Sequence, residues 1–478
     1  MCADFSELAS VFRGRDRLAR RVSAILGGSV AAVAVVLAVP QVRAQFNTNL
    51  PNPERQNAAQ FDMAVAIDTM CPNPDFRNNT DPETEKLNAT CDAVAFTLPN
   101  NEQRDGVVQS LNGEEVQAAQ QQVGEISDAQ IDNISSRLNA VRAGTAGAGL
   151  SLAGLNVLSG GRVLALGDLQ DLPIVPAQFE GSSLLSRLGI FATGELTFGD
   201  KDQSGEIEGY DFDTQGVTIG ADWRFTDNLV GGAAVGYSRF NADFDESINS
   251  PDGQNLDSDA VQFSLFGSYY PTDQLFVDGI ASFGWHFYDS ERRILVPSAA
   301  NPATLVETSA EGDFDAIHYG VATNVGYTIR RFGANLTPIA RLEYLRAEID
   351  DFTEDSPEAI ELTFDDHDAD SLTLNLGLEA DYPISTGLGI IAPNIRAEYV
   401  HDFIGDADGV LVRYAADPTR LSEFEVSTED KDQDYGILGA GVAMTLQGGW
   451  AAFVDYHTFV GLDNFDIHTV NAGLRLQF

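Results

Sequence analysis

The chain has 478 residues, more than one domain of ordinary size needs, and this length predicts two or three parts. Its formal net charge is −44, from 28 basic and 72 acidic residues, and its pI is about 4.1. This charge excludes nucleic acid as a partner, because phosphate binding requires a basic surface that releases counterions. It also opposes electrostatic attraction to anionic lipid, and it favours solubility in a salty or cation-rich medium.

Residues 1–44 have the features of a signal peptide. A cluster of arginines precedes an apolar stretch from Val22 to Val39, and Val42-Arg43-Ala44 then supplies the small residues that signal peptidase requires. The alternative is a membrane-spanning helix. The apolar stretch is only weakly hydrophobic and ends at Pro40, and both features disfavour that alternative.

Two cysteines remain once the signal peptide is removed, Cys71 and Cys91. An even pair in an exported chain predicts a disulfide. Closing a loop of roughly 20 residues would stabilise a small unit by about 3 kcal/mol. A metal site is a poorer explanation, because no histidine lies nearby and two thiolates are too few ligands.

Residues 45–143 are predicted to form a small, mainly helical region that carries this cystine. Gln56 to Met70 has the apolar spacing of a helix, and a loop rich in Asn, Pro and Thr is expected between the cysteines. Asn112 and Ser127 are predicted to cap two further helices. An apolar stripe on the second of these is expected to pack on the preceding helix. Its members are Ile131, Ile134, Leu138 and Val141.

From Arg187 to Phe478, apolar side chains recur at every second position, which is the period of a strand with two unlike faces. Residues 144–185 are predicted to be a Gly/Ala-rich linker with one small hairpin, Leu150–Val157 against Arg162–Leu166. Many of the predicted strands are longer than those of soluble sheets and suit tilted membrane strands. The twelve predicted strands are 187–199, 210–226, 228–243, 258–270, 274–289, 313–331, 334–349, 370–384, 387–404, 433–447, 449–460 and 465–478.

The connections between these strands alternate between short turns and long acidic loops. Membrane barrels show this asymmetry, with tight turns on the periplasmic rim and long loops outside. The long loops are expected at 243–257, 290–312, 350–370 and 405–432. We therefore predict an all-β fold over residues 186–478, a twelve-stranded antiparallel transmembrane β-barrel whose closure leaves no edge unpaired in lipid. A soluble sandwich or jelly roll is the alternative, and strand length, loop alternation and aromatic residues near strand ends disfavour it.

Several segments resemble the autotransporter β-domain. They are Ser186–Phe191, Phe198–Asp202, Tyr210–Asp222 and Asp227–Ser238, and the likeness covers about 290 residues up to Phe478. It implies a pore in the Gram-negative outer membrane, plugged by a helix, that brings an N-terminal passenger to the cell surface. It also implies that barrel-assembly machinery recognises the terminal Phe478.

The N-terminal region departs from the pattern of this family. Usual passengers are long β-helices, whereas this one has about 100 residues and helical signals. Some members cut themselves at an Asn-Asn pair in the plugging helix. Here Asn133 and Asn139 stand alone, and the Asn-Asn pairs at 78–79 and 100–101 lie far from the barrel. We therefore expect no self-cleavage.

The segment 200–211 matches the twelve-position loop that binds calcium in helical proteins. Its oxygens would come from Asp200, Asp202, Ser204, the Glu206 carbonyl and Asp211, with Gly205 making the turn. However, the segment joins two strands, and an aspartate replaces the usual bidentate glutamate. The alternative is a plain acidic hairpin loop.

The sequence carries none of the short motifs of hydrolases, metalloproteases or nucleotide-binding enzymes, so we expect no enzyme. Export or display of the N-terminal region is the leading prediction. The second is an adhesin-like or structural outer-membrane protein that acts through its acidic loops. The third is a surface hydrolase built on His367, which lies beside Asp365, Asp366 and Asp368. The expected partners are outer-membrane lipid and the barrel-assembly machinery, and calcium is the only cofactor considered.

Overall fold

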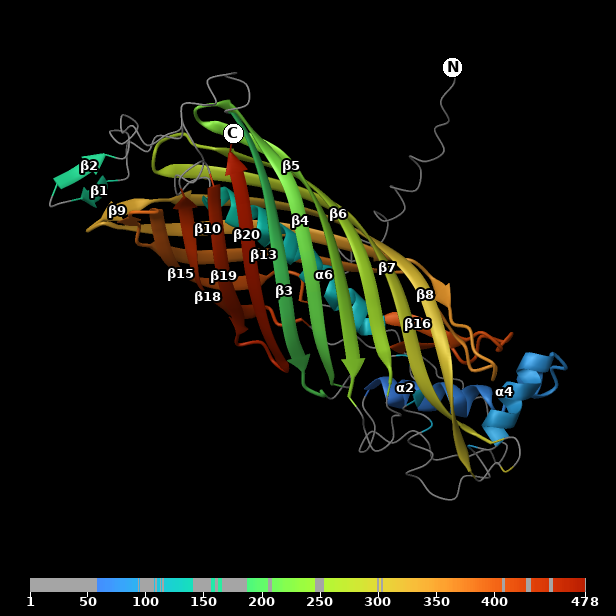
Figure 1. Cartoon of the computed structure of the whole chain (residues 1–478). Coiled ribbons are helices and arrows are strands. Elements are labelled where there is room, and N and C mark those ends of the chain that lie inside the picture. Colours follow the sequence, from blue (N-terminus) through green and yellow to red (C-terminus); the bar gives the residue numbers. More distant parts are fainter. Residues whose placement is uncertain are drawn as a thin grey trace, which may run out of the picture. The chain divides into compact units, whose positions relative to one another are not determined.

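Helices occupy the N-terminal part of the chain and strands the C-terminal part (Figure 1). The helices are α2 (Ala58–Met70), α3 (Pro74–Arg77), α4 (Pro82–Asp92) and α6 (Val116–Ala140). None of them is long and apolar enough to cross a membrane. The structure, a computed structural model, describes residues 58–92, 94, 107, 110–111, 113, 116–140, 156–159, 162–165, 187–204, 209–245, 253–298, 301, 304–405, 409–426, 431–446 and 450–477. The predicted signal peptide, residues 1–44, lies outside these.

Twelve strands form one antiparallel sheet that closes on itself, as predicted. Each strand pairs with its neighbour in the chain, and the last pairs with the first, so that no edge is left free. They are β3 (Leu188–Lys201), β4 (Tyr210–Thr226), β5 (Leu229–Phe244), β6 (Asn255–Tyr269), β7 (Leu275–Pro297), β8 (Leu305–Tyr327), β10 (Ala334–Ile349), β13 (His367–Asp381), β15 (Gly389–Asp402), β18 (Asp434–Leu446), β19 (Trp450–Val460) and β20 (Phe465–Gln477). Two short strands lie at the short turns and pair with the barrel strand that follows each of them. They are β9 (Ile329–Arg331), which pairs with β10, and β14 (Ile384–Thr386), which pairs with β15.

The two faces of each barrel strand differ as the alternation predicts. In β6, Ser264 is 2% exposed while its neighbour Leu265 is 66% exposed. The outward residue faces lipid, because exposed apolar side chains that water would disfavour form a band around the barrel. Exposed aromatic residues border this apolar band on both sides. On the side of the long loops they are Tyr237, Trp285, Tyr319, Tyr344, Tyr399 and Tyr456, and on the side of the short turns Phe225, Tyr269, Tyr327, Tyr382 and Trp450.

The segment between the two cysteines is helical, so the prediction of a loop there was wrong. Asn73 accepts hydrogen bonds from the backbone N–H groups of Asp75 and Phe76 and so caps α3. Asp81 accepts from Glu83 and Thr84 in the same way before α4. In both cases a proline follows at the first helical position, where its missing N–H costs nothing. The Asn-Pro and Asp-Pro pairs are helix starts and not loop signals.

The second predicted helix start, at Ser127, is also wrong. Helix α6 runs without a break from Val116 to Ala140 and contains Ser127 in its interior. A serine inside a helix disfavours it by only a few tenths of a kcal/mol, so contacts with the barrel decide the outcome. Asn112 lies outside the described residues.

Two of the predicted long loops contain strands of their own. These strands form a four-stranded antiparallel sheet, here called the loop sheet. They are β11 (Phe352–Thr353), β12 (Leu362–Phe364), β16 (Val410–Tyr414) and β17 (Phe424–Val426). The hairpin of β7 and β8 also continues far beyond the predicted strand ends, to the pair Pro297 and Leu305. The small hairpin predicted in the linker is present as β1 (Asn156–Ser159) and β2 (Arg162–Ala165). Its first strand is shifted from the predicted one.

Candidate functional site

Helix α6 lies against the inward face of the barrel and is held there by hydrogen bonds of its amide side chains. Gln130 donates a hydrogen bond to Ser264 Oγ (3.1 Å) and accepts one from Thr218 Oγ1 (2.6 Å). Asn133 Nδ2 donates to Glu195 Oε2 over 3.1 Å. All of these side chains are buried. Because unpaired amides inside a barrel would be costly, these contacts fix the rotation of the helix.

The apolar stripe of α6 packs on the barrel wall, and the prediction that it packs on a preceding helix was wrong. Ile131, Ile134 and Leu138 are fully buried in a cluster with five barrel residues. The five are Phe191, Ala234, Phe266, Ile280 and Ala322. These five residues are apolar positions on an inner face that is otherwise polar. The apolar stripe of α6 packs on them. Val141 lies outside the described residues.

The direction of α6 follows from contacts near its first turns. Tyr210 OH donates to Gln121 Oε1 (2.7 Å), and Tyr288 OH donates to the carbonyl of Ala119 (3.3 Å). Tyr210 begins β4 at the rim that carries the long loops, whereas Glu195, the partner of Asn133, lies in the middle of β3. The helix therefore begins at the loop side of the barrel and runs toward the short turns.

Charged side chains gather on the inner wall of the barrel at β10, β15 and β19. Arg341 lies between Glu343 and Glu398, and Arg396 lies between Glu398 and Asp455, with N···O distances of 3.7–3.9 Å. Arg475 faces Asp222 at 3.6 Å. Charges at this depth must avoid lipid and find a partner of opposite sign, so they point into the barrel. These mid-strand charges therefore face the lumen.

At the loop side, residues 58–92 and Val94 of the N-terminal segment and the surface loops bury one continuous core. We call this assembly, with the loop sheet and the projecting ends of β7 and β8, the outer cap. Met63, Met70, Phe76, Val410 and Val426 are all fully buried in this core. Helix α2 lies against β17. The N-terminal segment and the loops are thus parts of one folded unit.

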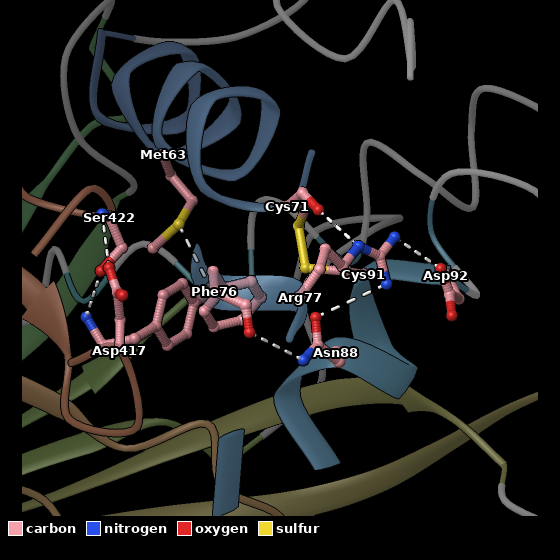
Figure 2. Close-up of a disulfide and its surroundings, with 10 residues drawn as sticks. Met63, Cys71, Phe76, Arg77, Asn88, Cys91, Asp92, Asp417 and Ser422 are labelled. Carbon is pink, nitrogen blue, oxygen red and sulfur yellow. Dashed lines mark hydrogen bonds and ion pairs between the residues drawn. A yellow bond between two sulfur atoms is a disulfide. The ribbon is translucent and has the colours of Figure 1, made fainter. Parts of the chain in front are cut away.

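The predicted disulfide between Cys71 and Cys91 is present and ties the end of α2 to α4 (Figure 2). Both cysteines are buried. Arg77 braces the bridge, because its Nε donates to the carbonyl of Cys71 (2.6 Å) and its Nη2 pairs with Asp92 (2.6 Å). Asn88 Nδ2 donates to the carbonyl of Phe76 (3.3 Å) and closes the turn between α3 and α4. The segment therefore has its own covalent and polar cross-links.

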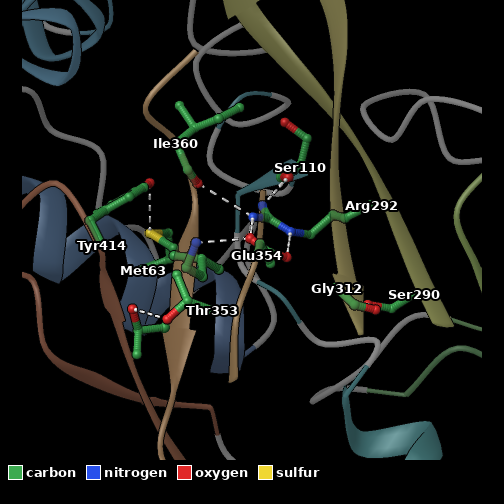
Figure 3. Close-up of polar contacts among 11 residues, drawn as sticks. Met63, Ser110, Ser290, Arg292, Gly312, Thr353, Glu354, Ile360 and Tyr414 are labelled. Carbon is green, nitrogen blue, oxygen red and sulfur yellow. Dashed lines mark hydrogen bonds and ion pairs between the residues drawn. The ribbon is translucent and has the colours of Figure 1, made fainter. Parts of the chain in front are cut away.

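A buried ion pair at the centre of the cap joins three separate parts of the chain (Figure 3). Arg292 of β7 and Glu354 of the loop after β10 are 2% and 4% exposed in their side chains, and Arg292 Nε donates to Glu354 Oε1 over 2.9 Å. Arg292 Nη1 also donates to the carbonyl of Ser110 (3.1 Å). Glu354 accepts a further bond from the N–H of Leu362 (2.8 Å). Sequence reasoning missed this pair, because two charges 62 residues apart carry no local pattern.

The residues of the predicted calcium loop lie at the end of the β3–β4 hairpin. Asp200 and Asp211 are opposite one another in the sheet, and Asp202 and Ser204 follow β3. Glu206 and Gly205 lie outside the described residues. Burial and the charges of Asp211, Asp202 and Asp200 raise the pKa of nearby Asp245. Within the described part of the chain, no group of three acidic, histidine or cysteine side chains is arranged to hold a metal ion.

His367 is buried at the start of β13, and two of the three acidic residues beside it form ion pairs. Its Nδ1 lies 3.3 Å from the carbonyl of Asp365. The side chain of Asp365 pairs with Arg413 (2.8 Å), and that of Asp368 pairs with Arg346. Burial lowers the pKa of His367. Phe478, the predicted assembly signal, lies outside the described residues, one position after β20.

Comparison with known proteins identifies the barrel. Residues 190–457 match the family described as the autotransporter β-domain. Outer membrane protein B of Rickettsia prowazekii is 24% identical over 266 residues, and outer membrane protein A of Rickettsia conorii is 28% identical over 267 residues. These matches cover 52% and 54% of this chain but only 16% and 12% of those proteins. An esterase of Pseudomonas aeruginosa, EstA, is 24% identical over 209 residues, which are 42% of this chain and 28% of the esterase.

Solved structures similar to this chain include the translocator domain of the autotransporter NalP from Neisseria meningitidis. It is 16% identical, with a TM-score of 0.48, over 61% of this chain and 89% of that one. The β-domain of the Bordetella autotransporter BrkA is also 16% identical, with a TM-score of 0.42, over 61% of this chain and all of that one. The family match covers more than half of the chain. The chain therefore belongs to the autotransporter β-domain family, and its barrel resides in the outer membrane of a Gram-negative bacterium.

Proposed function

We propose that the barrel carries its own N-terminal segment through the lumen and displays it on the cell surface as part of the outer cap. The direction of α6 is the observation that supports this most strongly. The helix leaves the lumen at the loop side, so the residues before it emerge beside the long loops. In a membrane barrel these loops face the outside of the cell.

The cap explains why a segment of this size can be displayed without a long passenger. Alone, residues 58–94 would form three short helices with one cystine and little core. Packed on the loop sheet, they bury Met63, Met70 and Phe76 completely. Display and folding are then the same event, because the segment completes its core only after it has crossed the lumen.

An epitope inserted between Asn79 and Thr80 tests the proposal. This turn joins α3 to α4 and is exposed at Asn78, Thr80 and Asp81. We expect antibody to label intact cells. An epitope inserted between Gly387 and Leu388, in a short turn at the opposite rim, should be labelled only after the outer membrane is permeabilised. The reverse pattern would contradict display.

The same geometry supports a second function, in which the surface of the cap is itself adhesive. The loops contribute strands and the N-terminal segment contributes helices to one unit, so the two cannot act separately. Deleting residues 58–94 should therefore remove any adhesion together with folding of the loop sheet. Adhesion that survived this deletion would assign the function to the barrel loops alone.

We infer that the barrel itself is not an enzyme and that His367 is structural. Two of the three carboxylates beside His367, those of Asp365 and Asp368, are already paired with Arg413 and Arg346. A catalytic histidine requires a carboxylate oriented toward its ring. The likeness to EstA covers a minor share of that esterase. His367→Ala is therefore expected to leave any ester hydrolysis by intact cells unchanged, and loss of such an activity would contradict this inference.

We also infer that the barrel-assembly machinery recognises the C-terminal strand, including Phe478. Strand β20 pairs with both β19 and β3, and so its insertion closes the sheet. Removing Phe478 should reduce the amount of assembled barrel while leaving the purified, refolded protein able to close. Normal assembly without Phe478 would contradict this.

A further inference from the structure

We propose that the surface loops are a binding site for the chain's own N-terminal segment, strong enough to hold the segment on the cell after the chain between them is cut. This inference rests on the proposed display of the segment, and goes beyond it. A segment that is only tethered would leave the cell when its chain is cut. A segment that is bound would remain.

Helix α2 provides the first contact between segment and loops. Met63 is fully buried, and Tyr414 of β16 donates a hydrogen bond from its hydroxyl to Met63 Sδ over 3.5 Å (Figure 3). Val410, Val412 and Val426 of the loop sheet are also fully buried in the same core. These valines would face water if α2 were absent, since the N-terminal segment supplies the other half of the core.

Helix α4 provides a second contact, with the same loop after β15 and also with the loop after β10. Thr84 Oγ1 donates to the carbonyl of Ala416 (2.9 Å), and Lys86 Nζ donates to the carbonyl of Pro357 (3.4 Å). Leu87 is buried beside them in the core. The loop after β10 and the loop after β15 are therefore both held by one helix.

The stretch before α6 provides a third contact, with the projecting β7 strand. Ser110 accepts a hydrogen bond at its carbonyl from Arg292 (3.1 Å), and its Oγ accepts one from the N–H of Leu295 (3.1 Å). Ser110 is itself buried. Three separate stretches of the N-terminal chain thus contact three separate loops, and the contacts are apolar as well as polar. This is the arrangement of a bound partner and not of a loose tether.

The position of the cystine makes the inference testable in the full-length protein. A site-specific protease sequence inserted between Asn79 and Thr80 places the cut between Cys71 and Cys91. After cleavage, the disulfide still joins the two pieces. After reduction with a membrane-impermeant reagent, the piece ending at Asn79 is held only by the packing of α2 and α3. Its location is read by immunoblot of the cell pellet and the supernatant with an antibody against residues 58–79.

We expect the cut and reduced piece to remain in the cell pellet at the level of uncut cells. Its appearance in the supernatant in proportion to cleavage would overturn the proposal. Met63→Asp should release the piece, because it places a charge in the shared core. Val65→Asp is the matched control on the same helix. Its side chain is 40% exposed, so the piece should stay bound.

The same experiment separates failure of this inference from failure of the proposed display. Cleavage of intact cells followed by release contradicts binding alone. Cleavage only after permeabilisation contradicts display, and release or retention is then read in the permeabilised cells. Equal release of the Met63→Asp and Val65→Asp pieces would also overturn the proposal, because the buried face of α2 would then have no part in retention.

Discussion

Arg292 and Glu354 face one another in the core of the cap, each almost fully buried, and the carboxylate also accepts the N–H of Leu362. Removing the carboxylate leaves Arg292 buried without its counter-charge, and the loss of one member of a buried ion pair destabilises folded proteins by about 3–5 kcal/mol. Glu354→Ala should therefore unfold the cap at a lower urea concentration, measured by the protease sensitivity of residues 58–94. The barrel itself should stay folded, so that the unheated protein migrates faster in a gel than the heated protein.

Glu307→Ala is the matched control for that prediction. Glu307 pairs with Arg293, the residue next to Arg292, at 3.3 Å, but its side chain is 50% exposed. Exposed ion pairs stabilise proteins by about 0–1 kcal/mol. Equal effects of the two substitutions would show that burial of the Arg292–Glu354 pair has no special role.

The junction between α2 and β17 should be more stable in mild acid. Burial first, and then the charge of Glu425, raise the pKa of Asp62 above its ordinary value of 3.8. The folded cap therefore holds this proton more tightly than the unfolded chain does, so its stability rises as pH falls through the folded pKa and levels off below 3.8. Asp62→Asn should stabilise the cap at neutral pH, and the gain should vanish in acid. Glu85→Gln, on the exposed face of α4, should show neither effect.

The barrel could be predicted from the sequence almost strand by strand, for a clear physical reason. Lipid on one side and a polar lumen on the other enforce a period of two over every strand, as at Ser264 and Leu265. The cap could not be predicted, because its core joins residues that are far apart in the chain, such as Met63 and Tyr414. The helix starts at Asn73 and Asp81 were visible in the sequence and were misread as loop signals.

The lipid-facing surface is tested by one substitution in β6. Leu265 is 66% exposed and lies midway along β6 between Tyr269 at the turn side and Val261, the partner of Tyr237 and Trp285, at the loop side. Leu265→Arg should destabilise the barrel by about 2–4 kcal/mol, as arginine does at the middle of a bilayer. The measurement is urea unfolding of the barrel in lipid vesicles.

Leu388→Arg is the control for the lipid-facing substitution. Leu388 is 74% exposed as well, but it lies in a short turn beyond the membrane strands. Its replacement should have almost no effect. If neither arginine substitution lowered the stability of the barrel to urea, the result would argue against a lipid-facing outer surface.

Calcium binding at residues 200–211 remains a prediction. The carboxylates of Asp200, Asp202 and Asp211 raise the pKa of Asp245 together with its burial, and a bound cation would offset their repulsion. We expect calcium to raise the unfolding temperature of the purified protein and the chelator EGTA to reverse this. Asp202→Asn should abolish the shift. An unfolding temperature that is the same with and without calcium would show that this segment is a plain acidic hairpin loop.

The candidate site was only partly visible in the sequence. Residues Ile131, Ile134 and Leu138 could be recognised as an apolar stripe, but its partner could not, because an inward-facing residue such as Phe191 has the same local pattern as a lipid-facing one. The amide contacts of Gln130 and Asn133 are likewise invisible until the helix and the strands are placed together. Cys71 and Cys91 could be paired because no other cysteine follows the predicted signal peptide.

Cross-linking of α6 to the barrel wall tests most directly whether the chain is threaded through its own lumen. Asn133 and Glu195 are in hydrogen-bond contact, whereas Leu196, the next residue of β3, is 53% exposed on the lipid-facing side. In the protein carrying Asn133→Cys and Glu195→Cys, a short bismaleimide should join the two positions, as read by mass spectrometry of the proteolysed chain. In the protein carrying Asn133→Cys and Leu196→Cys it should not. Efficient cross-linking to position 196, or none to position 195, would place the helix outside the lumen and contradict the account.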